Sequence, residues 1–134
     1  MATCAGVLSV IGACGNGATM PPNDAGAVTV TRDEIVVRLD LLAALQTPDS
    51  MHVLGEQQVA ILRVGEADYR AFTNVCTHAG CGIYIFAGQR LRCQCHGSEF
   101  DVNGTNVAGP APSPLRRYAV TFDSSARELR IALG

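Results

Sequence analysis

The sequence has few residues of several types, and each shortage excludes a class of protein. It contains no tryptophan and no lysine, and aromatic residues make up only 5% of its 134 positions. The ten basic residues, all arginine, are outnumbered by twelve acidic ones, so the charge balance gives no support to nucleic-acid binding. With 14 glycines and six prolines, the composition favours one loop-rich, mostly β domain over a helical bundle.

Cysteine, by contrast, is frequent, and four of the six cysteines lie in one central stretch. Residues 76–81 read Cys-Thr-His-Ala-Gly-Cys, and residues 93–98 read Cys-Gln-Cys-His-Gly-Ser. Each segment offers a cysteine and a histidine at short spacing, and a predicted β-hairpin separates the two segments. A [2Fe–2S] cluster with two thiolates on one iron and two imidazoles on the other needs this set of ligands. The four central cysteines are therefore consistent with two cluster ligands and one disulfide.

Zinc is the alternative occupant of such a site, because a tetrahedral zinc ion also binds two cysteines and two histidines. The order Cys-x-His followed by Cys-x-x-His, with two further cysteines interleaved, is unusual for zinc. Zinc sites are colourless, so absorption in the visible range distinguishes the two metals. His52, which lies outside both segments, is expected to be an ordinary strand or surface residue.

The first 27 residues are predicted to lie outside the folded domain. Residues 1–14 form a small, apolar segment, shorter than the about 18–20 residues that cross a bilayer. The segment is similar to the apolar part of an export signal, although no basic residue precedes it. Its end, Ile11-Gly12-Ala13-Cys14, resembles the bacterial lipobox and predicts a lipid anchor at Cys14, with an ordinary apolar segment as the alternative. Residues 15–27 are expected to be a flexible linker.

The remaining chain alternates between strand-like and turn-like segments. One helical turn is expected at residues 41–45, before Pro48, and Asn103-Gly104 predicts a tight turn. We expect an all-β fold, an antiparallel β-sandwich or barrel with a metal-bearing subdomain inserted near its middle. Strands are predicted from period-two and β-branched patterns at residues 28–31, 34–39, 51–54, 58–64, 69–72, 82–86, 90–93, 99–102, 117–122 and 128–133.

The two cysteine- and histidine-bearing segments resemble the cluster-binding boxes of Rieske iron–sulfur proteins, and the resemblance extends over residues 28–134. It implies one [2Fe–2S] cluster, with Cys76 and Cys93 on one iron and His78 and His96 on the other.

The same resemblance implies a disulfide between Cys81 and Cys95. This bond would close a loop of about 15 residues and contribute roughly 3 kcal/mol in the chain-entropy model. Rieske ferredoxins and Rieske oxygenases typically lack the extra cysteine pair. Its presence favours the exported, high-potential class found in cytochrome bc complexes, because structural disulfides need an oxidising compartment.

A proline-rich run completes the resemblance. Residues 109–112, Gly-Pro-Ala-Pro, are similar to the family's proline loop, which covers the cluster. The cluster-binding subdomain is accordingly expected at about residues 74–112. The residues expected around the cluster, in addition to its ligands, are Gly80, Ser98 and Pro110.

The resemblance implies one-electron transfer, by a subunit that is not catalytic alone. The implied setting is a membrane-associated respiratory complex, with a quinol-oxidising cytochrome b-type subunit as donor and a cytochrome c-type acceptor. A subunit of an arsenite oxidase-like molybdoenzyme, with that enzyme's large subunit as partner, and a free-standing periplasmic carrier are the alternatives. We expect the periplasmic face of a bacterial membrane, with a tether through the N-terminus. Arg116-Arg117 is predicted to be either a solvated strand edge or a contact for an acidic partner.

Phe100 departs from the pattern of the high-potential members, which carry a tyrosine there. That tyrosine hydroxyl donates a hydrogen bond to a ligand sulfur, and phenylalanine has no donor. We therefore predict an intermediate potential that depends on pH above neutrality. Phe100→Tyr should raise the midpoint potential in protein-film voltammetry by roughly 40–65 mV, the equivalent of one bond of about 1–1.5 kcal/mol. An unchanged midpoint would refute this account of the position.

Overall fold

The computed structural model describes residues 26–134 and confirms the all-β fold. Within these residues the helical structure is a single 3₁₀ turn, η1 (Ala43–Leu45), as predicted, and none of the described residues form a helix long and apolar enough to span a membrane. The predicted segment 1–14, with Cys14, and nearly all of the predicted linker lie outside the described residues. The strands are β1 (Val28–Val30), β2 (Glu34–Arg38), β3 (Ser50–Leu54), β4 (Val59–Arg63), β5 (Tyr69–Thr73), β6 (Ile85–Ala87), β7 (Arg90–Arg92), β8 (Glu99–Asp101), β9 (Asn106–Ala108), β10 (Arg117–Asp123) and β11 (Glu128–Ala132).

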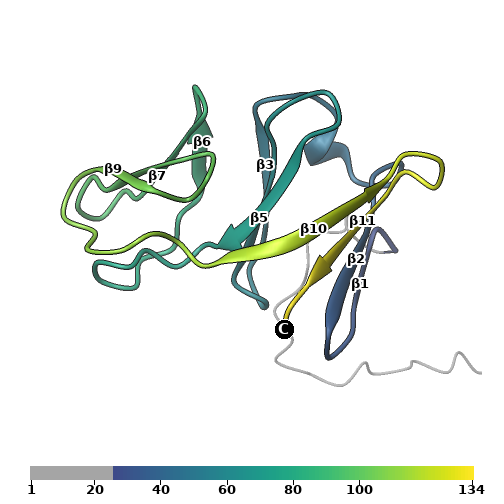
Figure 1. Cartoon of the computed structure of the whole chain (residues 1–134), viewed down its shortest axis with the longest axis horizontal. Helices are drawn as coiled ribbons and strands as arrows, with labels where there is room; N and C mark the ends of the chain where they lie inside the picture. The colour runs from purple at the N-terminus through teal and green to yellow at the C-terminus, as the bar shows by residue number, and fades with distance from the viewer. Residues whose placement is uncertain (1–25) are drawn as a thin grey trace, which may run out of the picture.

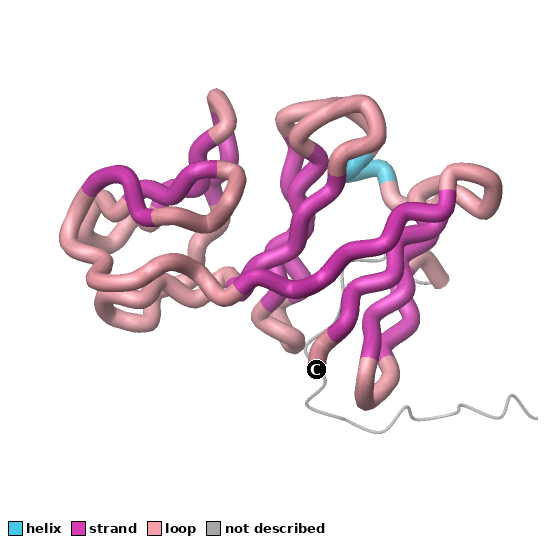
Figure 2. Tube along the Cα trace, viewed as in Figure 1, coloured by secondary structure: helices cyan, strands magenta, loops and turns pink. Residues whose placement is uncertain are grey.

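Seven strands form one antiparallel sheet in the order β1-β2-β11-β10-β5-β4-β3 (Figure 1). The sheet is curled, and β10 joins its two halves (Figure 2). β10 pairs with β5 only through Arg117 and Tyr118, and from Ala119 to Asp123 it pairs with β11. Buried residues of β2 and β11 share one core with buried residues of β4 and β5, so the halves pack face to face as in a sandwich.

The core between the two halves of the seven-stranded sheet, which we call the base core, follows from strand alternation. Ile35 and Val37 in β2, and Leu129 and Ile131 in β11, lie two positions apart and have exposed fractions of 0%. Side chains two positions apart in a strand point to the same face. Each pair therefore faces the core, while the residues between them face solvent.

β4 is buried on both faces, which explains its unbroken apolar sequence. Its residues from Val59 to Leu62 are all buried. Val59 and Ile61 pack in the base core, and Leu62 packs in a second core on the other side of the sheet. A strand covered on both faces has no polar side to alternate with. We call the seven-stranded sheet the base sheet and define the inserted subdomain as residues 74–115. β4 therefore packs against both the base core and the inserted subdomain.

The inserted subdomain contains a four-stranded sheet in the order β6-β7-β8-β9, and it lies at the left in Figure 1. The β6–β7 hairpin turns through Gly88 and Gln89, which both have positive φ values, 58° and 61°. Two such residues in succession are typical of a tight hairpin turn. The hairpin register, with Ile85 opposite Arg92, brings the segments 76–81 and 93–98 together at the open end of the hairpin.

Two polar contacts hold the inserted subdomain against the base sheet. The Asp49 carboxylate accepts hydrogen bonds from the backbone amides of Gly88 and Gln89, both at 3.2 Å. The Arg70 guanidinium, from β5, donates to the Val102 carbonyl at 3.0 Å and to the side chain of Asn103. These contacts join the turn of the β6–β7 hairpin and the turn between β8 and β9 to the base sheet.

The strand pattern differs from the prediction in two places of the inserted subdomain. β9 has no counterpart among the predicted strands; it pairs with β8 and follows the predicted Asn103-Gly104 turn. The predicted strand at 82–86 begins only at Ile85. The Ile83 amide instead donates to the Asn74 carbonyl at 2.7 Å, which closes the first cysteine- and histidine-bearing loop.

Two residues near the predicted domain boundaries are packed into the cores. Ala27 has an exposed fraction of 1% and belongs to the base core, one residue before the predicted start of the domain. Leu115 belongs to the second core, and its amide donates to the Gly104 carbonyl at 2.9 Å. Leu115 packs in this core together with Leu62 and Phe72 of β4 and β5.

Asp123 organises the turn between β10 and β11. Its Oδ1 accepts hydrogen bonds from the Ser125 hydroxyl at 2.6 Å and from the backbone amides of Ala126 and Ser125 at 3.1 and 2.9 Å. These bonds, the Ser125 hydroxyl first, lower the pKa of Asp123 below 3.8 because they favour the charged carboxylate. Their stabilising effect is present above the pKa of the unfolded chain, and it is lost as pH falls through the lower folded pKa.

Ser125→Ala should raise the pKa of Asp123 toward 3.8, because it removes the interaction that lowers this pKa most. An NMR pH titration of the Asp123 carboxyl group measures the change. Ser124→Ala, in the same turn, is the matched control and should leave the pKa where it is. Equal shifts in the two variants would contradict the assignment.

Candidate metal centre

The first loop of the site is closed by its own backbone. The Cys76 amide donates to the Cys81 carbonyl at 2.8 Å, and the Gly80 amide donates back to the Cys76 carbonyl at 3.0 Å. Gly80 has φ of 74°, a conformation that glycine adopts without a steric penalty. The loop places the side chains of Cys76 and His78 on a turn whose shape the backbone fixes.

The second loop repeats this backbone design. The Cys93 amide donates to the Ser98 carbonyl at 2.8 Å, and the Gly97 amide donates to the Cys93 carbonyl at 3.1 Å. Gly97 also has φ of 74°. Because the two loops match bond for bond, each presents its first cysteine at an equivalent position.

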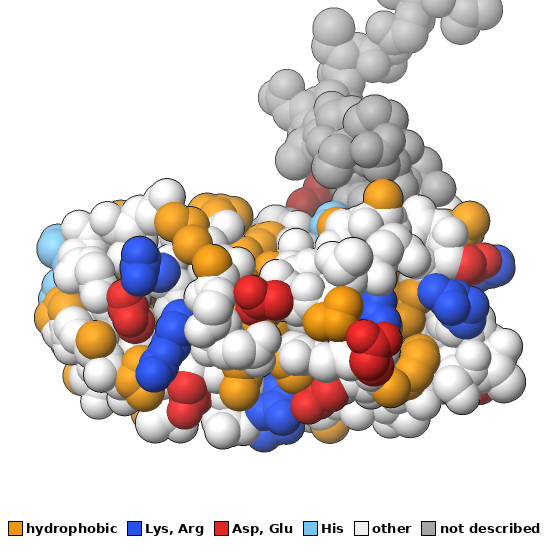
Figure 3. Space-filling view, turned by 90° about the horizontal axis from the view of Figure 1, so that it is seen from above, with side chains coloured by type: hydrophobic (Ala, Val, Ile, Leu, Met, Phe, Trp, Pro, Cys, Tyr) orange, Lys and Arg blue, Asp and Glu red, His pale blue; other side chains and the backbone are white. Residues whose placement is uncertain are grey.

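The donor atoms of the two loops separate into a buried pair and an exposed pair. Cys76 and Cys93 are free thiols with exposed fractions of 2% and 1%. His78 and His96 are exposed, and their Nδ1 atoms lie 3.2 Å apart with the rings edge to face. Figure 3 shows histidine atoms at the surface of the left end, which the inserted subdomain occupies in Figure 1. The two imidazoles thus meet at the surface, while the two thiols lie in the second core of the inserted subdomain.

A disulfide joins Cys81 in the first loop to Cys95 in the second, as predicted. The Cα atoms of the two cysteines lie 6.5 Å apart, within the usual range for disulfides. The Sγ of Cys93 lies within 4.8 Å of both disulfide sulfurs. Because the disulfide uses two of the four central cysteines, it leaves Cys76 and Cys93 as the thiol donors.

The proline-rich run lies over the second loop. The Ala111 amide donates to the Ser98 hydroxyl oxygen at 3.1 Å, and Ser98 is fully buried. A Cβ atom added at Gly109 would lie 2.5 Å from the Cα of Ser98, and Gly109 has φ of 82°. Only glycine fits there, so the run contacts the loop backbone directly. Pro110, between these two contacts, is exposed.

A second contact, made by the residue directly after this run, could not be predicted from the sequence. The Thr77 hydroxyl, between the two candidate ligands of the first loop, donates to the Ser113 carbonyl at 2.7 Å. The two residues are 36 positions apart, so only the folded chain brings them together. The proline-rich run, extended by one residue to Ser113, is therefore bound to both loops, to the first through Thr77 and to the second through Ser98.

The arrangement suits a metal group with mixed ligands. Two nitrogens at about 2.0 Å from one tetrahedral ion lie about 3.3 Å apart, close to the 3.2 Å between the two imidazole Nδ1 atoms. The thiols lie on the buried side, among apolar residues of the second core. The residues present thus fit a [2Fe–2S] cluster. The apolar residues of this core are Leu62, Phe72, Ile83, Leu91, Phe100, Ala111 and Leu115.

Comparison with known proteins identifies this kind of site. Residues 18–119 match the model of the Rieske [2Fe–2S] domain. The chain is 30% identical over 113 residues to the cytochrome b6-f complex iron-sulfur subunit of Synechococcus sp. (strain JA-3-3Ab), covering 78% of this chain and 66% of the relative. It is 34% identical over 87 residues to the cytochrome bc1 complex Rieske iron-sulfur subunit of Corynebacterium efficiens, covering 62% of this chain and 21% of the relative. The chain thus spans less than two thirds of the length of these relatives.

Solved structures show the same fold. The plasma membrane Rieske protein PetC3 of Synechocystis PCC 6803 is 25% identical, with a TM-score of 0.51 over 63% of this chain and 85% of that one. The ferredoxin of carbazole 1,9a-dioxygenase from Nocardioides aromaticivorans is 27% identical, with a TM-score of 0.53 over 67% and 92%. The cofactor of such a domain is one [2Fe–2S] cluster, which agrees with the donor set described above. The chain belongs to the Rieske [2Fe–2S] domain family.

Proposed function

We propose that this chain transfers single electrons as the iron–sulfur subunit of a membrane-associated, quinol-oxidising complex. The observation that carries the proposal is the site itself, with two buried thiols, two exposed imidazoles and a disulfide between their loops. The relatives named as subunits of cytochrome bc1 and b6-f complexes support it.

Cys76 and Cys93 would hold one iron of the cluster, and His78 and His96 would hold the other. When bound, the cluster supplies a one-electron couple, with potentials of about −150 to +300 mV in this ligand class. The chain's own contribution is to bury the thiol side in an apolar core and to present the imidazoles at the surface. An exposed imidazole lies within reach of a partner and offers its second nitrogen to a hydrogen bond.

The proposed partners are a cytochrome b-type subunit as donor and a cytochrome c-type protein as acceptor. The disulfide supports a location outside the cytosol, on the periplasmic face of a bacterial membrane, because such bonds persist in oxidising compartments. A tether through the N-terminus, with lipidation at Cys14, and a molybdoenzyme large subunit as the alternative partner stay predictions.

A free-standing electron carrier is the second candidate. The similarity to a dioxygenase ferredoxin, over 92% of that protein, favours it. Isolation from the native membrane separates the two proposals. A complex subunit remains bound to a haem-containing protein after mild solubilisation, whereas a free carrier is recovered alone.

EPR-monitored redox titration of the purified protein tests the ligand assignment. One [2Fe–2S] signal that appears on reduction with a one-electron midpoint is the expected result. His78→Ala should abolish the signal, because one iron loses a ligand. His52→Ala, in β3 and outside both loops, is the matched control and should retain it. A wild-type signal in His78→Ala would contradict the assignment.

The proline-rich run should protect the cluster from solvent, because it is fastened to both ligand loops. Gly109→Ala would place a Cβ against the Ser98 backbone and push this run away. We expect the visible absorption of the variant to bleach several-fold faster in air. Gly88→Ala is the control, since Gly88 also has positive φ but has no atom within 4 Å of an added Cβ. Equal bleaching in the two variants would show that backbone strain alone is responsible.

A further inference from the structure

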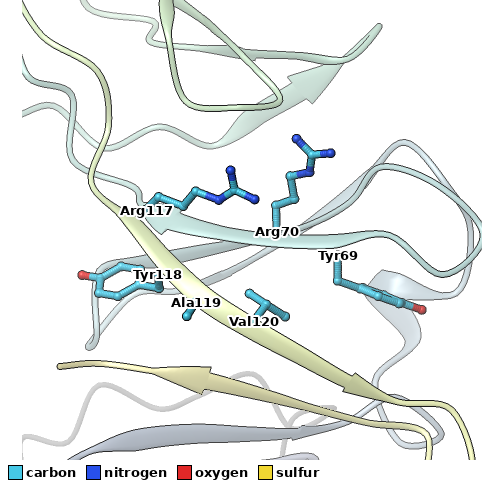
Figure 4. A pocket seen from close by; sticks show the side chains of 6 residues that line it. All are labelled: Tyr69, Arg70, Arg117, Tyr118, Ala119 and Val120. Carbon is cyan, nitrogen blue, oxygen red and sulfur yellow. The ribbon is translucent and has the colours of Figure 1, made fainter.

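A cavity of about 240 Å³ lies where β5 and β10 separate, away from the ligand loops (Figure 4). The two strands pair only at Arg117 with Phe72 and at Tyr118 with Ala71. Beyond these pairs β10 continues along β11 and β5 along β4, so the sheet opens between them. The cavity at this opening is lined by Tyr69, Arg70, Arg117, Tyr118, Ala119 and Val120.

Two guanidinium groups lie on one side of this opening. The side chains of Arg70 and Arg117 extend from neighbouring strands to the same face of the sheet (Figure 4). Arg70 is held in place by Asp68, with contacts of 3.3 and 3.0 Å, and by the Val102 carbonyl. Its orientation is therefore fixed, and its charge is balanced by one carboxylate.

Arg117 keeps its positive charge unbalanced. It is exposed, and no carboxylate among residues 26–134 forms an ion pair with it. Its neighbour Arg116 lies 5.0 Å over the ring of Tyr118, which points to the opposite face of the sheet, and donates to the Leu133 carbonyl. Two arginines, Arg70 and Arg117, thus share this face, and Asp68 pairs with Arg70 alone. A guanidinium beside a cavity offers the paired donors that fit a carboxylate.

We propose that this pocket binds a carboxylate, supplied by an acidic side chain of a protein that docks on the β5–β10 face. The volume of the cavity admits a glutamate or aspartate side chain. Of the two predictions made for Arg116-Arg117 from the sequence, this geometry favours, for Arg117, the contact with an acidic partner.

The choice of a protein as the source of the carboxylate rests on the proposed function. An electron-transfer protein must orient its partner, and residues 74–88, 93–98 and 102–115, which include the ligand loops and the proline-rich run, contain no charged side chain. Electrostatic steering toward the exposed imidazoles therefore has to come from elsewhere on the surface. The arginine pocket is a site from which it can come.

NMR of the arginine Nε–H groups in the whole chain tests the proposal. A capped tetraglutamate peptide should shift the signals of Arg117 and Arg70 in a saturable way. Arg117→Ala should weaken this binding by roughly tenfold or more, the effect of losing a charge-assisted pair. Arg32→Ala, an exposed arginine in the β1–β2 turn, is the matched control and should leave the affinity unchanged.

Two results would overturn the proposal. Malonate binding as tightly as the peptide would show that the pocket takes small free acids, not a protein side chain. Shifts spread evenly over the exposed arginines, with equal affinity in Arg117→Ala and Arg32→Ala, would show general charge attraction and no site. The EPR spectrum of each variant distinguishes failure of this proposal from failure of the proposed electron-transfer function, because it reports the cluster whether or not the pocket binds the peptide.

Discussion

The Cys81–Cys95 disulfide is the covalent link between two loops that also meet at the imidazoles of His78 and His96. Each loop is closed by the same pair of backbone hydrogen bonds, so the disulfide fixes two equal turns side by side. The thiols of Cys76 and Cys93 then face the apolar core, and the imidazoles face solvent. The second core buries the sulfur side, and the disulfide holds the two loops together so that the exposed nitrogen side, which an outward-facing redox site requires, belongs to the same site.

The base sheet supports the site because two of its strands, β4 and β5, contribute side chains to both cores. β4 and β5 send alternate side chains into the base core and into the core behind the thiols, with Ile61 on one side and Leu62 on the other. Asp49 and Arg70 add polar contacts across the same junction. A change in the base sheet is thus transmitted to the ligand loops through packed side chains, since close-packed interiors have little free space to absorb it.

The disulfide could be predicted because two short segments, each with its cysteines, histidine and glycine within six residues, resemble the boxes of a known family. The assignment of the four cluster ligands stays a prediction. Most strands could be predicted because alternation is a property of neighbouring positions. What could not be predicted depends on segments far apart. The contact of Thr77 with Ser113 and the opening between β5 and β10 exist only after folding. The strand predicted at 82–86 begins late for a similar reason. The Ile83 amide donates to the Asn74 carbonyl, 9 positions earlier, and therefore does not pair with a neighbouring strand of the β6–β9 sheet.

The central claim is that two imidazoles from different loops bind one iron of a single [2Fe–2S] cluster. Pulsed EPR of the reduced protein, prepared with ¹⁵N-histidine, measures this directly. The account predicts strong couplings to two histidine nitrogens, both replaced by ¹⁵N couplings in the labelled sample. Coupling to one nitrogen or to none would contradict it, because the cluster would then be held by another set of residues.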